Sequence, residues 1–177
     1  MIDHPPVHIL CFGNLWHGDD GFGLHVLQQL RERRCLPPHV STFDAGTAGL
    51  NALPLFDGCT KAVLVDAVRT GAHIGRVLRL SLNDRAPNAA QVGMHGSGLE
   101  SILAALPTVF ANRTMPELVL IGAEIGQITP FTAALSPPVE AATTQAVELV
   151  LLECTNQAGS PGLLDGHGWL EPATSRV

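Results

Sequence analysis

The sequence has few basic residues, no C-x-x-C pair and no long hydrophobic run. Lysine and arginine total 10 against 16 acidic residues, which gives a net charge of −6. This balance argues against nucleic acid as the main partner, because phosphate contacts need clustered basic side chains. No window approaches the roughly 18 to 20 apolar residues that cross a bilayer, so we expect no membrane insertion.

The amino-terminal segment and the cysteines indicate a cytoplasmic protein. The stretch "MIDHPPVHILCFGN" has no basic region before its apolar run and no cleavage site of small residues, so we expect no signal peptide. The spacing of the cysteines suits neither a zinc site nor a disulfide framework. We therefore expect reduced thiols at all four positions, Cys11, Cys35, Cys59 and Cys154.

Apolar runs alternate with helical periodicities along the chain. Strands are expected at Val7–Phe12, 40–43, Lys61–Val68, 75–82 and 117–125. Helices are expected at 22–34, in a short segment after Asp44, from Leu99 to about Pro107, and at 136–154. This order predicts the α/β class: a single three-layer domain with an open, mostly parallel sheet of about five strands and helices on both faces. We assign the domain to residues 1–154 and expect a flexible tail over 155–177, where Gly and Pro are frequent.

Acidic side chains follow three of the expected strands. Asp19 and Asp20 lie in the glycine-rich turn after the first strand, Asp44 follows the second, and Asp66 ends the third. His95 lies among glycines in the loop before the helix that starts at Leu99. Ligands of doubly wound sheets bind beyond the carboxyl ends of the strands, so we expect these side chains to converge on one edge.

Each of these residues also has a purely structural explanation. Asp19 or Asp20 could cap the helix that follows, although capping does not require two acids. Asp44 is explained equally well as the cap of the short helix after it. Asp66 ends a buried strand, so its carboxylate should meet a cation, a hydrogen-bond donor or a metal. A histidine such as His95, taken alone, is more often an ordinary loop residue than a ligand.

The chemistry of this set favours a metal. Two carboxylates and an imidazole suit a borderline divalent ion. The H-E-x-x-H pattern of hydrolytic zinc sites and the G-x-S-x-G nucleophile motif are both missing. Acids in the first turn would repel a pyrophosphate, so we expect no nucleotide cofactor.

The stretch "GNLWHGDDGFG" resembles the G-N-x-L-x-x-D-[DE]-G-x-G signature of the hydrogenase maturation endopeptidases, which trim the C-terminal extension of a nickel-iron hydrogenase large subunit. The segments "DAGTAGL", "VLVDAV", "MHGSGLESIL" and "ALSPPVEAA" are similar to further motifs of that family and occur in the same order. The resemblance covers roughly residues 7–153. It departs at Trp16, where the family has leucine, and at Ala45, where it has glycine; the second departure weakens the inference about Asp44.

The resemblance implies a protease that acts on a nickel-iron hydrogenase large-subunit precursor. It places the family's three metal-contacting positions at Asp20, Asp66 and His95, with the nickel carried by the precursor rather than permanently bound. Asp19 would orient the turn or cap the helix. An empty cluster of acids repels itself, so one carboxylate is expected to hold a proton until the metal arrives.

Two routes to hydrolysis stay open at this point. The metal could activate water, or an aspartate such as Asp44 could act as general base; the candidate catalytic residues are therefore Asp20, Asp66, His95 and Asp44. One alternative is a non-catalytic nickel chaperone or docking factor that uses the same ligands. Another is a small-molecule enzyme on a flavodoxin-like sheet, although the phosphate-binding glycine loop that it predicts is missing. The sequence does not define the oligomeric state.

Overall fold

The computed structural model describes residues 5–34, 36–82 and 98–155 of the chain. Within these residues, five strands form one sheet in the order β2-β1-β3-β5-β4. β1, β2, β3 and β5 pair in parallel, and β4 pairs antiparallel with β5. The strands are β1 Val7–Phe12, β2 Val40–Gly46, β3 Lys61–Val68, β4 Val77–Ser81 and β5 Glu117–Glu124. The predicted open, mostly parallel sheet is confirmed.

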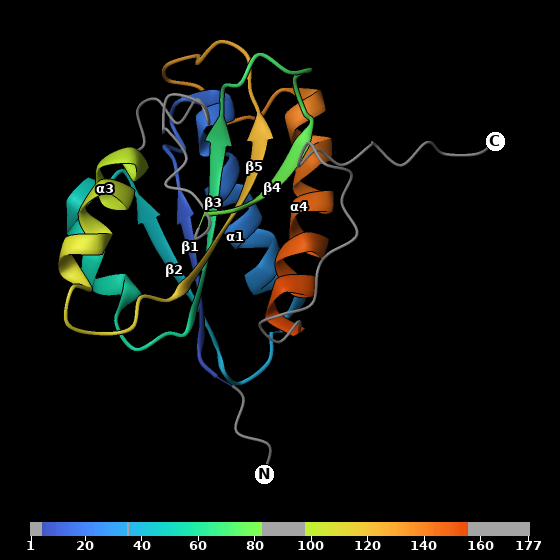
Figure 1. Ribbon diagram of the computed structural model, residues 1–177. Helices are drawn as coiled ribbons and strands as arrows, with labels where there is room; N and C mark the ends of the chain where they lie inside the picture. The colour runs from blue at the N-terminus through green and yellow to red at the C-terminus, as the bar shows by residue number, and fades with distance from the viewer. Residues whose placement is uncertain (1–4, 35, 83–97, 156–177) are drawn as a thin grey trace.

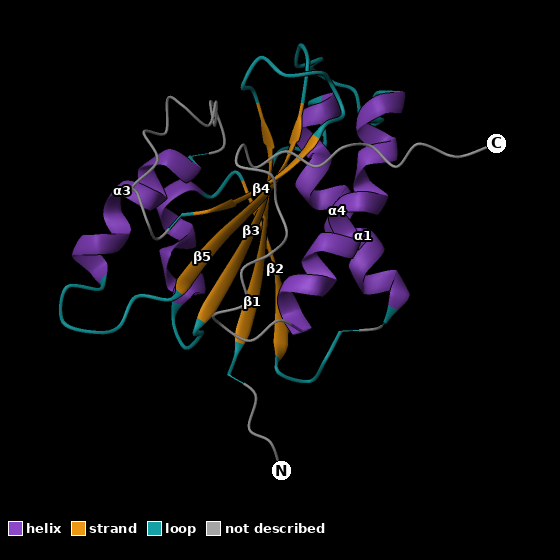
Figure 2. Cartoon of the chain, turned by 45° about the vertical axis from the view of Figure 1, so that its right-hand side comes forward, coloured by secondary structure: helices purple, strands orange, loops and turns teal. Residues whose placement is uncertain are grey.

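Helices cover both faces of this sheet, as the alternating pattern predicted (Figure 1). α1 (Phe22–Arg33) and α4 (Pro137–Thr155) pack together on one face. The 3-10 helix η2 (Gly49–Phe56) and α3 (Leu99–Val109) pack together on the other, and Figure 2 shows the sheet between the two layers. A second 3-10 helix, η1 (Gly18–Gly21), connects β1 to α1.

β3 lies in the middle of the sheet and is buried along all of its length. Its alternate side chains point to opposite faces, as the pleat of a strand requires. Val63 and Val65 pack with the core under α1 and α4, whereas Leu64 and Val68 pack with the core under α3. A strand that is apolar on both faces is typical of a parallel sheet covered on both sides.

Several boundaries differ from the sequence predictions. β2 continues to Gly46, so Asp44 lies inside the strand rather than after it. α3 continues through Pro107 to Val109, because the Phe110 N–H still reaches the Leu106 carbonyl at 2.9 Å in the turn that follows the proline. α1 ends at Arg33, where Arg34 adopts a left-handed conformation (φ 47°) that closes the helix.

The carboxyl-terminal helix includes Thr155, the first residue that the sequence assigned to the tail. The remainder of that expected tail, 156–177, lies outside the described residues, and so does the segment 83–97 that contains His95. Of the helices that the structure describes, none combines the length and the apolar character needed to span a membrane.

Candidate active site

The turn after β1 is built around Gly13. Its φ of +125° favours glycine, and a Cβ at this position would overlap the carbonyl oxygen of Asp20. The Gly13 N–H donates to the Gly46 carbonyl at 3.1 Å, and the Asn14 N–H donates to the Asp20 carbonyl at 3.2 Å. The glycine therefore lets the turn fold back so that Asp20 lies beside the end of β1.

Gly23 brings the beginning of α1 against two strands. A Cβ at this position would overlap the Phe12 carbonyl and would lie 2.6 Å from the Val65 carbonyl. Only glycine permits this approach, which also places η1 in contact with β3. The glycines of the "GDDGFG" stretch thus set the position of both acids relative to the end of β3.

Asp19 is a structural residue that joins two distant segments. It is buried, and its two carboxylate oxygens accept the Ser136 N–H at 2.6 Å and the Ser136 hydroxyl at 2.8 Å. Ser136 directly precedes α4 and accepts the Glu140 N–H of the first turn. The prediction that Asp19 orients the turn is confirmed, but neither acid makes a capping hydrogen bond to α1.

Asp20 lies half-buried at the same turn with a different environment. Burial raises the pKa of its carboxyl above the usual aspartate value, and this effect outweighs the lowering by His17, by the Asn14 N–H and by the charge of Arg69. Arg69 directly follows β3, so Asp20 is within electrostatic reach of that strand's carboxyl end. A cation that approached this carboxyl would lower its pKa again.

Asp66 is almost completely buried, with 1% of its surface exposed. Its Oδ1 accepts the Ala67 N–H at 2.8 Å, which confirms the expectation that this carboxylate meets a donor. By strand alternation it shares a face with Leu64 and Val68, the face that α3 covers. Asp66 thus stands at the carboxyl end of the central strand on the α3 side.

Asp44 lies on the other face of the sheet. It pairs with Cys11, and Cys11 pairs with Val65; both of these partners belong to the core under α1. Neighbouring side chains across a sheet point to the same face, so Asp44 faces α1 and the sheet separates it from Asp66. The alternative explanation of Asp44 as a helix cap is wrong, because η2 has no side-chain cap and starts after Ala48.

The Cys11 thiol is in the sheet core between these two acids. Burial raises its pKa far above the usual cysteine value, and the charges of Asp44 and Asp66 add to this rise. The thiol is therefore neutral and unsuited to act as a nucleophile.

Metal binding by the predicted set is not tested by the described part of the chain. Over residues 5–34, 36–82 and 98–155, no three His, Cys, Asp or Glu side chains are grouped closely enough to hold a metal ion. The third predicted ligand, His95, lies outside these residues. The ligand assignment of Asp20, Asp66 and His95 stays a prediction.

Sequence reasoning missed Glu124, a buried acid at the end of β5. Its carboxylate accepts the Thr70 N–H at 2.9 and 3.0 Å, the Thr70 hydroxyl at 2.7 Å and the Gly71 N–H at 2.9 Å. It therefore fixes the loop after β3, next to Arg69. The sequence contained a signal for Glu124, because this acid follows the buried residues of an apolar strand in "GAE", as Asp66 does in "LVD". The argument that such a carboxylate must meet a donor, a cation or a metal applies to both residues.

The comparison with known proteins agrees with this architecture. A family model described as hydrogenase maturation protease matches residues 24–153 of the 177-residue chain. The chain belongs to the hydrogenase maturation protease family. The match begins just after the two acids and includes β2 to β5 and nearly all of α4.

Named relatives of this maturation protease come from several bacteria. The hydrogenase expression/formation protein HoxM of Azotobacter vinelandii is 30% identical over 150 residues, which cover 83% of the chain and 71% of that protein. The hydrogenase 2 maturation protease of Escherichia coli is 27% identical over 145 residues, or 81% of the chain and 87% of the relative. The solved structure of the E. coli hydrogenase maturating endopeptidase HybD superposes with a TM-score of 0.73 at 26% identity, covering 84% of the chain and 91% of HybD.

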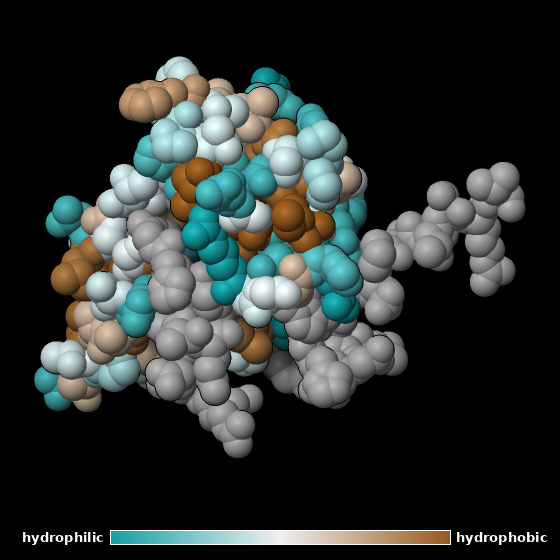
Figure 3. All heavy atoms as spheres, turned by 90° about the horizontal axis from the view of Figure 1, so that it is seen from above, coloured by the Kyte–Doolittle hydropathy of each residue, from teal (hydrophilic) through white to brown (hydrophobic). Residues whose placement is uncertain are grey.

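The surface of this maturation protease beside Asp20 carries two exposed aromatic residues. Trp16 is 68% exposed and Phe131 is 94% exposed, whereas Phe22 is completely buried in the core. The two loops that carry them are joined, because the Thr132 N–H donates to the Trp16 carbonyl at 3.1 Å and the Gly18 N–H donates to the Thr132 carbonyl at 2.7 Å. Figure 3 views this end of the molecule, where hydrophilic side chains lie between separate hydrophobic patches.

Proposed function

We propose that this maturation protease removes the C-terminal extension of a nickel-iron hydrogenase large-subunit precursor after nickel has been inserted. In this proposal Asp20, Asp66 and His95 contact the nickel that the precursor carries, so the metal is part of the substrate. The observation that carries the proposal is the contrast between two adjacent acids. Ser136 occupies both carboxylate oxygens of Asp19, whereas Asp20 is half-buried with a raised pKa near the end of β3.

The donor set fits nickel chemically. Carboxylate and imidazole ligands suit a borderline divalent ion, and three protein ligands leave positions open for the precursor's own groups. The Ala67 N–H orients the Asp66 carboxylate by donating a hydrogen bond to its Oδ1, as outer-shell donors do for metal ligands. A nickel ion beside Asp20 would favour the ionised carboxylate and so act against the raised pKa that burial causes.

Peptide-bond hydrolysis needs an activated water at the scissile bond. A nickel ion that is already bound by thiolates is a weak Lewis acid for a distant bond, which favours recognition as the main role of the metal. A nearby carboxylate would then act as general base. Asp44 is the candidate acid outside the nickel-contacting set, and it lies across the sheet from Asp66.

The place of action in this proposal is the cytoplasm. The described cysteines Cys11, Cys59 and Cys154 are free thiols, which fits a reducing compartment. The precursor is the proposed macromolecular partner.

The test is a cleavage assay with the purified chain and a large-subunit precursor from the same organism. The precursor is supplied with and without nickel, and the products are followed by intact mass. The proposal predicts loss of a C-terminal peptide from the nickel-loaded precursor only. Binding of the precursor without cleavage in either state would instead favour the non-catalytic nickel chaperone or docking factor.

A further inference from the structure

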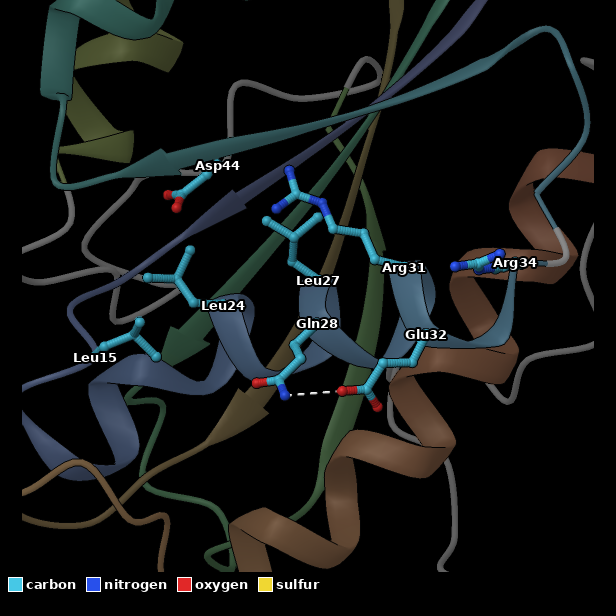
Figure 4. Close-up of a pocket in the computed structure, with 8 residues that line it drawn as sticks. All are labelled: Leu15, Leu24, Leu27, Gln28, Arg31, Glu32, Arg34 and Asp44. Atoms are coloured by element: carbon cyan, nitrogen blue, oxygen red, sulfur yellow. Dashed lines mark hydrogen bonds between the residues drawn. The ribbon is translucent and has the colours of Figure 1, made fainter.

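A groove runs along the exposed side of α1, between that helix and β2 (Figure 4). It has a volume of about 560 Å³, within the range of pockets that take small ligands. Leu15, Leu24 and Leu27 form an apolar floor, while Asp44 and Arg31 line the polar sides. An apolar floor with a few polar groups at its sides is typical of a binding surface rather than of a solvated helix face.

β2 is at one end of the strand order, with β1 as its single neighbour in the described sheet. The outer edge of such a strand presents N–H and C=O groups that an extended peptide can pair with. Peptides recognised in this way obtain affinity from main-chain hydrogen bonds and specificity from side-chain pockets beside the edge. The groove supplies those pockets directly next to β2.

Arg31 gives the groove a free positive charge. No hydrogen bond or ion pair within the described residues engages its guanidinium group, and Figure 4 shows it turned toward β2. Of its neighbours, Arg33 pairs with Glu148 at 2.5 Å and Glu32 accepts the Gln28 side chain at 2.9 Å, whereas Arg34 is a second cation that lines the groove. A free guanidinium beside an apolar floor is suited to bind a carboxylate, on a chain whose net charge is −6.

The groove reaches the turn that carries Asp20. Leu15 packs on the turn that carries Asp20, because a Cβ on Gly21 would lie 3.2 Å from the Leu15 Cα. Arg31 lies in the last turn of α1, which begins at Phe22. At about 1.5 Å per helical residue this separation is about 14 Å, a length that about four extended residues cover.

We propose that this groove holds the C-terminal extension of the precursor as a strand added along β2, with an acidic side chain about four residues past the scissile bond paired to Arg31. Asp44 lines the groove together with Leu15, and a second carboxylate would be repelled there. The two charges therefore set the direction of the bound segment. This inference rests on the proposed function, and it adds how the cleaved segment is recognised.

The first test measures binding of a fluorescein-labelled synthetic extension peptide to the full chain by anisotropy. Arg31→Ala should weaken binding about tenfold, while the neutral peptide with Gln or Asn at the acidic position should bind wild type and Arg31→Ala equally. Arg31→Lys should restore part of the affinity. Arg33→Ala is the matched control, because it removes a cation of the same helix that pairs with Glu148, and it should bind like wild type.

The second test separates this inference from the proposed function. With nickel-loaded precursor, Arg31→Ala should raise KM about tenfold and leave kcat unchanged. Cleavage by wild type with no effect of Arg31→Ala on either peptide affinity or KM would overturn the groove assignment alone. A wild type that binds the peptide through Arg31 but cleaves nothing would contradict the proposed function alone. An extension with no acid at about its third to fifth residue would also contradict the pairing.

Discussion

The carboxylate of Asp19 accepts two hydrogen bonds from Ser136, a residue 117 positions later in the chain. This contact joins the turn after β1 to the start of α4, at the end of the molecule where Asp20 lies. The adjacent acid has no such role, and burial raises its pKa by more than His17, the Asn14 N–H and Arg69 lower it. Two neighbouring aspartates therefore separate into a structural residue and a candidate ligand.

Replacing each acid by its amide should show this separation in stability. Asp19→Asn should lower the free energy of unfolding by about 1 to 3 kcal/mol, because charge-assisted hydrogen bonds of a buried group are lost. Asp20→Asn should keep or increase stability at neutral pH, since it removes a partly desolvated charge. Urea unfolding monitored by circular dichroism measures both. A larger loss for Asp20→Asn than for Asp19→Asn would contradict the assignment.

The raised pKa of Asp20 also predicts a pH dependence. The folded state holds the Asp20 proton more tightly than the unfolded state, so the stability contributed by this group is complete below the usual aspartate pKa of about 3.9 and is lost as the pH rises through the raised pKa. The stability of Asp20→Asn relative to wild type should therefore increase between pH 4 and neutrality. Parallel urea titrations over this range test it, and a constant or decreasing difference would refute the direction of the shift.

Glu124 should control the order of the loop after β3. Glu124→Ala removes the acceptor for the Thr70 and Gly71 N–H groups and should cost about 2 to 3 kcal/mol of stability, because the charge-assisted hydrogen bonds of a buried carboxylate are lost. Hydrogen exchange at these two amides should accelerate more than exchange in β1. The exposed pair partner Glu148 provides the control, since Glu148→Gln should change stability by less than about 1 kcal/mol.

A buried ion cluster at the opposite end of the sheet should dominate acid sensitivity. Glu153 contacts Lys61 and Arg79, each at 2.6 Å. Burial alone would raise the pKa of Glu153, but the hydrogen bonds and charges of Arg79 and Lys61 lower it overall. A lowered pKa contributes stability that is present above the usual glutamate pKa and is lost as the pH falls through the folded value.

Glu153→Gln should therefore lower stability by roughly 3 kcal/mol near pH 7, because it leaves buried cations without their partner. Below about pH 4.3, where glutamates ordinarily take up a proton, the variant should lose less additional stability than wild type. Urea unfolding at pH 3 to 7 provides the measurement. Identical pH profiles for the two proteins would show that another group governs acid unfolding.

The sequence predicted the sheet well because local hydrophobic patterns determine its strands. β3 is apolar on both faces and therefore had to be central, and the same pattern indicated β5. The burial of Asp66 follows from its place at the end of such a strand. The antiparallel direction of β4 could not be predicted, because strand direction depends on pairing with β5 and on no local pattern.

The roles of individual acids were harder to predict for the same reason. Asp19 bonds to a residue far away in the sequence, so its partner leaves no local signal. The face on which Asp44 lies depends on the register between β1 and β2, and β2 extends three residues beyond the predicted end at Phe43, to Gly46. Glu124, in contrast, could have been found by the reasoning applied to Asp66.

The measurement that tests the central claim most directly is processing of a nickel-loaded precursor by Asp20→Ala, Asp66→Ala, His95→Ala and Asp19→Asn, with circular dichroism as the check of folding. Asp66→Asn is measured beside Asp66→Ala, because Asp66 is buried and the amide keeps the size of its side chain. The account predicts that the variants of Asp20, Asp66 and His95 release no C-terminal peptide, whereas Asp19→Asn still does so at a reduced rate. Normal processing by Asp20→Ala, Asp66→Ala and His95→Ala would contradict the nickel-contact assignment, and an equal loss in Asp19→Asn would show that the wrong acid of the pair had been assigned.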